Sequence, residues 1–194
     1  MSTDVQSITE EYVDELINFA PTPEIEAAGI DKLQRSGCVA IFNMLVRNGL
    51  AYLADEVGMG KTYIALAVMS ILRYQKPNAR VLILTRRKSI QEKWKTDLFS
   101  FVQQNWRHSR HRVKNVEGDP VRLPQTPERL ANWINDLSKE PIHDTILRMS
   151  SFSFGITPEN AETEIKQQFN KHLACPLLRD YMLKVVETPT QKAF

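Results

Sequence analysis

A glycine-containing loop between an apolar strand and an apolar helix most constrains how this chain can fold. The loop reads Ala-Asp-Glu-Val-Gly-Met-Gly-Lys-Thr over residues 54–62. Residues 50–54, Leu-Ala-Tyr-Leu-Ala, predict a short buried strand before it. Residues 61–73 are apolar on nearly every side, which is typical of a helix enclosed in a core, and Val-Leu-Ile-Leu at 81–84 predicts a second buried strand. This order predicts a crossover unit with parallel strands, and therefore an α/β fold.

Helical patterns lie on both sides of this unit. Apolar residues at helical spacing predict helices over residues 8–19 and 31–47, the first ended by prolines and the second by Asn48-Gly49. The apolar positions at three-and-four spacing in the second helix are Leu33, Gly37, Ile41, Met44 and Leu45. Further helices are predicted at 89–101, 128–137, 157–173 and 177–186, and strands at 112–116 and 145–149.

Composition places the chain among ordinary globular proteins of about one domain. Of its 194 residues, 42% are hydrophobic and 25% are charged, which excludes wholesale disorder. The net charge of +2 implies that any basic surface is local. The only cysteines, Cys38 and Cys175, are far apart, so neither a disulfide scaffold nor a cysteine zinc site is supported. No apolar run of about 18 residues or secretory signal is present, so we expect no membrane span and a cytosolic or nuclear address.

The loop has the chemistry of a phosphate site. Gly58 and Gly60 allow the backbone to curl so that successive N–H groups approach phosphate oxygens, and the positive end of the following helix faces the same point. Lys61 would bring a charge to the β- and γ-phosphates, and Thr62 would bring a hydroxyl to Mg²⁺. The plainer alternative is a glycine turn that only begins a helix and leaves Lys61 in solvent. Its position between a strand and an apolar helix favours nucleotide binding.

The loop also carries a family resemblance. A general phosphate loop would have glycine at position 55, where this chain has Asp55. The string 54–62 instead resembles motif I of superfamily-two translocases of the Swi/Snf type, and within them the bacterial RapA-like branch. Three looser segments follow that family's order. Gln34, with Gly37 three residues later, looks like the Q-motif whose glutamine recognises adenine. Residues 81–94 look like motif Ia, and residues 146–152 look like motif Ib.

The resemblance implies a partial RecA-like lobe that binds ATP and Mg²⁺. Its mostly parallel sheet would be flanked by helices, with helical segments at both ends of the chain. The resemblance covers the ATP-binding lobe at about 31–155. Outside it, the helical patterns predict an N-terminal helical extension at 1–30 and a helical segment at 156–194 that is an insertion, a lid or packing material. The ATP-binding residues that the resemblance implies are Gln34, Asp55, Glu56, Val57, Gly58, Met59, Gly60, Lys61 and Thr62. Of these, Lys61 and Thr62 would act in the chemistry, with Thr62 in the Mg²⁺ shell.

The chain departs from the family in two respects. Arg87 occupies a position after the motif Ia strand where the family usually has proline. No two adjacent carboxylates follow Glu56, so the Asp-Glu-x-His motif is absent, as is a second lobe with its arginine finger. Hydrolysis needs those groups to hold the metal, orient water and neutralise charge. We therefore expect a fragment that binds ATP without fast turnover, from a parent that is an ATP-dependent DNA translocase or helicase.

Basic residues next to the predicted strands are candidate nucleic-acid contacts. Arg86, Arg87 and Lys88 follow the 81–84 strand, and Ser150 and Ser151 follow the 145–149 strand. Ligands of open parallel sheets bind at the carboxyl ends of strands, so these residues would meet a DNA backbone, as motifs Ia and Ib do in the family. A solvated charge cluster is the alternative.

Other features carry weaker expectations. The basic stretch at 107–112 is either a mobile loop or a DNA contact, and its two histidines are a weak metal candidate. The patterns around Trp94 and Trp133 favour core positions over base stacking, whereas Trp106 is undecided. Cys38 is expected to be a buried small residue.

Three functions remain open. The first is a Swi/Snf-type DNA-dependent ATPase whose partners are DNA, held by its phosphate backbone, and a second RecA-like lobe or larger assembly, in the nucleoid or the nucleus. The second is another P-loop NTPase module of AAA or signalling type. The third is a non-catalytic nucleotide-binding regulatory chain.

Overall fold

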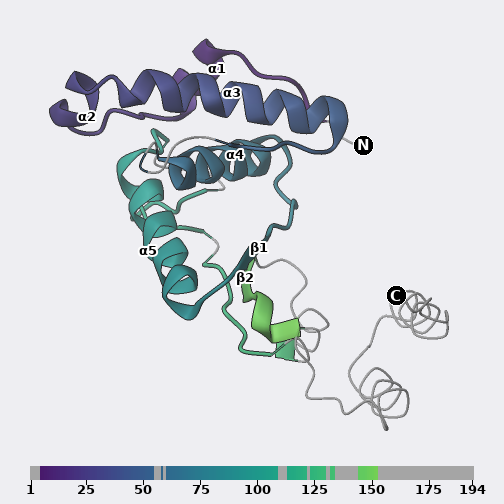
Figure 1. The fold of residues 1–194 in the computed structure, drawn as a ribbon. Coiled ribbons are helices and arrows are strands. Elements are labelled where there is room, and N and C mark those ends of the chain that lie inside the picture. The colour runs from purple at the N-terminus through teal and green to yellow at the C-terminus, as the bar shows by residue number, and fades with distance from the viewer. Residues whose placement is uncertain are drawn as a thin grey trace, which may run out of the picture.

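The fold joins a layer of helices to a small parallel sheet. The computed structural model describes residues 5–54, 58, 60–108, 113–121, 123–129, 132–133 and 144–152. In chain order the elements are α1 (Glu10–Leu16), α2 (Pro23–Ala27), α3 (Ile30–Asn48), α4 (Lys61–Gln75), β1 (Leu82–Thr85), α5 (Lys88–Gln104), β2 (Thr145–Arg148) and the 3₁₀ helix η1 (Met149–Phe152). Figure 1 shows α3 lying along α4, with α1 and α2 beside α3, and α5 running from these helices to the strands. The expected α/β class, a partial RecA-like lobe, is confirmed.

Helix α3 begins and ends at glycines, but it buries a different face from the one expected. Gly49 takes a left-handed conformation (φ 70°) and caps the helix at the predicted stop. The residues that α3 buries are Asp31, Gln34, Cys38 and Phe42. Of the expected stripe, Leu33 is 52% exposed and Met44 is 38% exposed, so that part of the prediction is wrong. The helix has to meet both α1 and α4, and the face that does so includes polar residues that the apolar pattern ignored.

Helix α4 is enclosed, as its apolar composition predicted. It packs between α3 and α5, and most of its residues from Ile64 to Ile71 are buried. At Gly37 the two helices approach closely, because a Cβ there would lie 3.0 Å from Cδ1 of Ile64. Because α4 is enclosed in the core, its N-terminal end is held in a fixed place. The predicted phosphate loop leads directly into this end.

The sheet confirms the strands expected near 81–84 and 145–149. β1 and β2 are parallel, and their register runs from Leu82 opposite Thr145 to Thr85 opposite Arg148. Helix α5, expected over 89–101, lies between them in sequence and is tied to β2 by Gln91, whose Nε2 donates to the Ile146 carbonyl over 2.5 Å. β1 is less buried than expected, since Leu82 and Leu84 are 43% and 53% exposed.

The strand expected at residues 50–54 is not formed. Within the described part of the chain, β1 pairs with β2, and residues 50–54 belong to no ladder. Ala51 and Leu53 are partly buried, whereas Leu50 and Tyr52 are 74% and 82% exposed. The segment therefore keeps the alternating burial of a strand, but no strand among the described residues pairs with it. The parallel pair that does form has α5, not α4, as its crossover helix.

A buried ion pair joins the end of α4 to the start of β2. Nη2 of Arg73 contacts Oδ2 of Asp144, and the two side chains are 2% and 1% exposed. Oδ1 of Asp144 also accepts a hydrogen bond from the Val81 N–H over 3.1 Å, just before β1. This pair fixes the helix and both strands together.

The N-terminal residues contribute directly to the core. Helix α1 is shorter than the expected 8–19, but Ile8, Val13, Leu16, Ile17 and Phe19 are all buried as its pattern predicted. The backbone after α1 also bonds to the end of α5, through the Asn18 N–H to the Asn105 carbonyl over 2.7 Å and a bridge between Ile17 and Trp106.

Several expectations fall wholly or partly outside the described residues. The helices at 157–173 and 177–186 do so completely, and most of the helix at 128–137 does too. Within the described residues 113–116 of the expected strand at 112–116, Lys114 forms an isolated bridge with Pro120, and the Val113 carbonyl accepts from the Val121 N–H over 3.1 Å. Among the helices that are described, none combines the length and apolarity that a membrane crossing requires.

Candidate nucleotide-binding site

Two glycines of the predicted phosphate loop are described, and both have a left-handed backbone. Gly58 and Gly60 have φ angles of 95° and 75°, in the left-handed region that glycine adopts without strain. Gly60 is the N-cap of α4, and its carbonyl accepts from the N–H groups of Tyr63 (2.8 Å) and Ile64 (3.2 Å). Asp55, Glu56, Val57 and Met59, which the sequence also placed in this site, lie outside the described residues.

Gln34, the residue of the predicted Q-motif, lies against Gly60. It is 7% exposed on α3, and its amide faces Gly60 at the start of α4. A Cβ on Gly60 would collide with Nε2 of Gln34 and would lie 3.1 Å from its Cδ. A side chain at position 60 would therefore have to displace the Gln34 amide, and the positive φ there already favours glycine. The contact brings together residues 26 positions apart in the sequence.

Lys61 and Thr62 occupy the first turn of α4, and both are partly buried. The first N–H groups of a helix have no intrahelical acceptor, and the helix dipole adds partial positive charge there. Because α4 is fixed in the core, these groups are held in place before any ligand arrives. Two glycines with positive φ, a lysine, a threonine hydroxyl and a helix N-terminus fit a magnesium–nucleotide phosphate chain.

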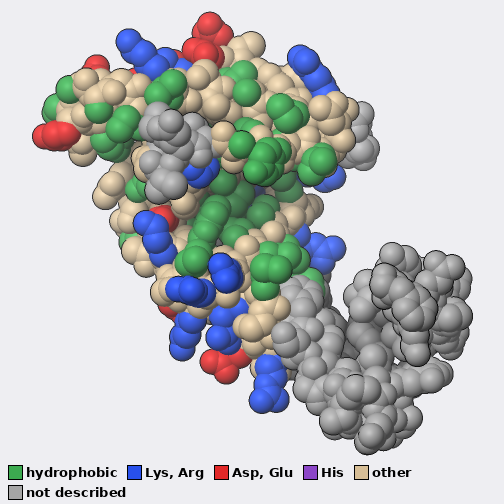
Figure 2. Space-filling model, in the orientation of Figure 1, with side chains coloured by type: hydrophobic (Ala, Val, Ile, Leu, Met, Phe, Trp, Pro, Cys, Tyr) green, Lys and Arg blue, Asp and Glu red, His purple; other side chains and the backbone are tan. Residues whose placement is uncertain are grey.

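A second group of predicted residues meets at the carboxyl edge of the sheet. Because Thr85 pairs with Arg148, the residues after β1 and those after β2 leave the sheet at the same edge. Arg86, Arg87 and Lys88 are all exposed at the turn from β1 into α5. Figure 2 shows Lys and Arg side chains gathered around the end of β1 and the start of α5, below a hollow lined by hydrophobic side chains.

The two serines after β2 differ in their surroundings. Ser150 is exposed, whereas Ser151 is 8% exposed and donates its hydroxyl hydrogen to the Glu128 carbonyl over 3.0 Å. Arg148, which the sequence reasoning passed over, lies partly buried at the same edge. Its place as the last residue of a strand, two positions before the first of the two serines, is the pattern that would have found it.

The remaining candidates take core positions or give no site. Trp106 is 2% exposed, and Trp94 and Trp133 are partly buried, with Nε1 of Trp133 donating to Oγ1 of Thr145 over 3.0 Å. Cys38 is fully buried as expected, and burial raises the pKa of its thiol to about 12. Of the basic stretch, Ser109 to Arg112 lie outside the described residues. Among the residues that are described, no group of three or more metal-ligating side chains occurs.

Comparison with known proteins identifies a family that matches most of the chain. Residues 11–140 match the ResIII family, described as "Type III restriction enzyme, res subunit". The match spans the N-terminal helices, the phosphate loop, β1 and α5. Neither a curated protein nor a solved structure matches the chain.

Proposed function

Because the chain belongs to the ResIII family of type III restriction enzyme res subunits, a helicase-like ATP-binding module of superfamily two, we propose that it is the ATP-binding part of a DNA-dependent translocase. Within superfamily two we assign it to the Swi/Snf type, on the string at 54–62 with Asp55 in place of glycine. The assigned partners are duplex DNA, contacted through its phosphates, and a second lobe or larger assembly. The location would be that of DNA, in a nucleoid or a nucleus.

The observation that carries the proposal is the junction of Gly60, Lys61 and Gln34. Glycine with a positive φ leads directly into a buried helix, and a glutamine from another helix closes against it. A turn that only began a helix would need neither the close approach of Gln34 nor the enclosure of α4. We assign ATP contacts to Gln34 and to Asp55 through Thr62, with Lys61 toward the β- and γ-phosphates and Thr62 toward Mg²⁺. Bound Mg²⁺ would neutralise charge on the phosphates.

The proposal places nucleotide binding in residues 31–155, with residues 1–30 packed on it and 156–194 as an inserted helical segment. We also propose that the chain alone hydrolyses little ATP. No two adjacent carboxylates follow Glu56, and the arginine finger of such enzymes is worth about 10³- to 10⁵-fold in rate. The chain should therefore hold ATP, while its parent hydrolyses it.

Titration with a fluorescent ATP analogue and Mg²⁺ tests the phosphate site. Lys61→Ala should lower the affinity of the full chain about tenfold or more, since a charge-assisted contact contributes about 1.5–3 kcal/mol. Lys76→Ala is the matched control, because Lys76 is exposed at the opposite end of the same helix. Equal affinities in the wild type and Lys61→Ala would remove the phosphate-loop assignment.

Salt-dependent DNA binding tests the sheet edge. Replacing Arg86, Arg87 and Lys88 together with alanine should reduce the slope of log K against log salt by about one unit per lost phosphate contact. A control triple of Lys32→Ala, Arg47→Ala and Lys76→Ala removes the same charge from exposed sites on α3 and α4. If both triples change the slope equally, the cluster at the sheet edge is ordinary surface.

A further inference from the structure

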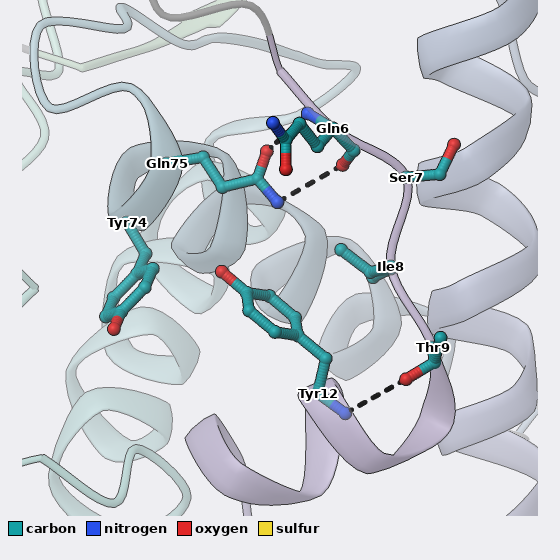
Figure 3. A pocket seen from close by; sticks show the side chains of 7 residues that line it. All are labelled: Gln6, Ser7, Ile8, Thr9, Tyr12, Tyr74 and Gln75. Carbon is teal, nitrogen blue, oxygen red and sulfur yellow. Dashed lines mark hydrogen bonds between the residues drawn. The ribbon is translucent and has the colours of Figure 1, made fainter.

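A pocket lies at the opposite end of α4 from the phosphate loop. It has a volume of about 420 Å³ and is lined by Gln6, Ser7, Ile8, Thr9, Tyr12, Tyr74 and Gln75. The first four belong to the extended segment before α1, Tyr12 lies on α1, and Tyr74 and Gln75 end α4 (Figure 3). Helix α4 has 15 residues, so about 20 Å of helix separates Lys61 from this pocket.

Paired amide contacts hold the wall of this pocket in place. Oε1 of Gln75 accepts from the Gln6 N–H over 2.8 Å, and Nε2 of Gln75 donates to the Gln6 carbonyl over 3.2 Å (Figure 3). Two residues later, the Asn43 side chain from α3 does the same for Ile8, at 2.7 Å and 2.8 Å. Each side-chain amide makes the two backbone hydrogen bonds that a neighbouring strand would otherwise make. The extended segment is therefore fixed to two helices.

Aromatic rings form the other side of the pocket. The rings of Tyr12 and Tyr74 meet edge to face with centroids 6.3 Å apart. Tyr74 in turn contacts Trp106 at 6.0 Å and His108 at 6.3 Å. Because Trp106 is 2% exposed, this cluster is anchored in the core. The Tyr74 ring is thus supported from behind, as a platform for a stacked ligand must be.

The described lining carries no charged side chain. Its polar groups are the Gln6 and Gln75 amides and the hydroxyls of Ser7, Thr9, Tyr12 and Tyr74. Burial is the main cause that raises the pKa of Tyr12, its side-chain hydrogen bond with Gln75 lowers it, and Tyr74 and Glu15 raise it slightly. The hydroxyl therefore keeps its proton and already has Gln75 as one partner. Neutral donors and acceptors around aromatic rings suit a flat, uncharged ligand with a polar edge, and they offer no counter-charge to a phosphate or an ammonium group.

We propose that this pocket binds a nucleobase, supplied either by a free nucleoside or by a single strand of nucleic acid. The base would stack on the tyrosine rings, and its polar edge would meet the Gln6 amide and the hydroxyls. Pockets of about 300–1,000 Å³ hold ligands of this size. The inference does not depend on the phosphate loop, because the two sites lie at opposite ends of α4.

Equilibrium dialysis of the full chain with labelled adenosine, thymidine and a short oligothymidylate tests the proposal. Tyr12→Leu should weaken binding about 5- to 150-fold, the effect of losing one stacking partner. Gln6→Ala should weaken it about 2- to 10-fold, the effect of one hydrogen bond. It should leave the fold intact, because Gln75 holds the backbone of Gln6 and not its side chain. Tyr52→Leu is the matched control, since Tyr52 is 82% exposed and lies outside the pocket.

The probes also separate the two sources of a base. Nucleoside binding that Gln6→Ala weakens assigns the pocket to a free base. Binding of the oligonucleotide alone, weakened by Tyr12→Leu and kept when Arg86, Arg87 and Lys88 are replaced, assigns it to a strand. The proposal fails if no probe binds the wild type, or if Tyr52→Leu weakens binding as much as Tyr12→Leu. It also fails if Gln34→Ala abolishes adenosine binding while Tyr12→Leu leaves it unchanged, which would place the base beside the phosphate loop.

Discussion

Gly60 is the residue at which local backbone chemistry and the candidate site meet. Its φ of 75° alone makes alanine unfavourable there by about 1–2 kcal/mol. An added Cβ there would also collide with the Gln34 amide, so the Gln34 side chain would have to move. Gly49 has a similar φ of 70° with nothing within 4 Å of its ideal Cβ position. Comparing alanine substitutions at Gly49 and Gly60 therefore separates the cost of backbone strain from the cost of the contact with Gln34.

We expect Gly60→Ala to reduce the free energy of unfolding more than Gly49→Ala, as measured by urea denaturation. Both substitutions introduce the same backbone strain, but only Gly60→Ala displaces the Gln34 side chain. Adding Gln34→Ala to Gly60→Ala should recover the difference between them. ATP-analogue affinity should fall in Gly60→Ala and not in Gly49→Ala. Equal losses of stability, with no recovery in the double variant, would mean that Gln34 does not contact the loop.

Cys38 gives the chain a specific pH dependence. Burial raises the pKa of its thiol from an ordinary value of 9.0 to about 12. Above pH 9 the unfolded thiol loses its proton while the folded thiol keeps it, so the folded state binds more protons. Stability is therefore full below pH 9 and falls as the pH rises toward 12, with a slope of about 1.4 kcal/mol per unit. Urea denaturation should show this slope in the wild type relative to Cys38→Ala.

Thiol alkylation gives an independent check on Cys38. In a Cys175→Ser background the folded chain should react slowly with iodoacetamide, because the thiolate is the nucleophile and is scarce below a pKa of about 12. Unfolding in urea should restore an ordinary rate. Rapid alkylation of the folded chain would contradict the burial of this side chain.

At the scale of elements, the ion pair of Arg73 and Asp144 joins α4 to the sheet. Asp144→Ala would leave a buried guanidinium without its carboxylate and also remove the acceptor of the Val81 N–H. We expect a loss of about 3–5 kcal/mol in the free energy of unfolding. Asp97→Ala, which breaks a more exposed pair with Lys93 at 3.7 Å, should cost under about 1 kcal/mol. Similar costs for the two variants would show that the Arg73 pair is solvated.

The sequence predicted elements well where the signal is local. The helices α3, α4 and α5 and both strands lie where their patterns placed them, and Asn48-Gly49 ends α3 as expected. The failures need information from elsewhere in the chain. Which face α3 buries depends on the positions of α1 and α4, and a strand at 50–54 requires a neighbouring strand. The meeting of Gln34 with Gly60 was predicted only through the family resemblance, since no local pattern links positions 34 and 60.

At the scale of the whole molecule, the N-terminal segment and the phosphate-loop helix share one hydrophobic core. Val13 and Leu16 on α1 belong to the same buried cluster as Ile64 and Leu66 on α4. We set residues 1–30 apart as an extension because the family resemblance begins at about residue 31. Periodicity shows that a helix has an apolar face, and it does not show which partner covers that face.

Because α1 and α4 share one core, a substitution that destabilises α1 should also destabilise α4. Leu16→Ala should lower the hydrogen-exchange protection of α1 and α4 amides by the same amount, about 2–5 kcal/mol, because the two helices would open in one cooperative step. Leu33→Ala is the matched control, since Leu33 is 52% exposed and Leu16 is 2% exposed. ATP-analogue binding to Leu16→Ala should weaken only as far as the folded fraction falls. A loss of protection confined to α1 would instead mean that α1 opens separately from α4. The phosphate loop would then be supported by the remaining helices alone.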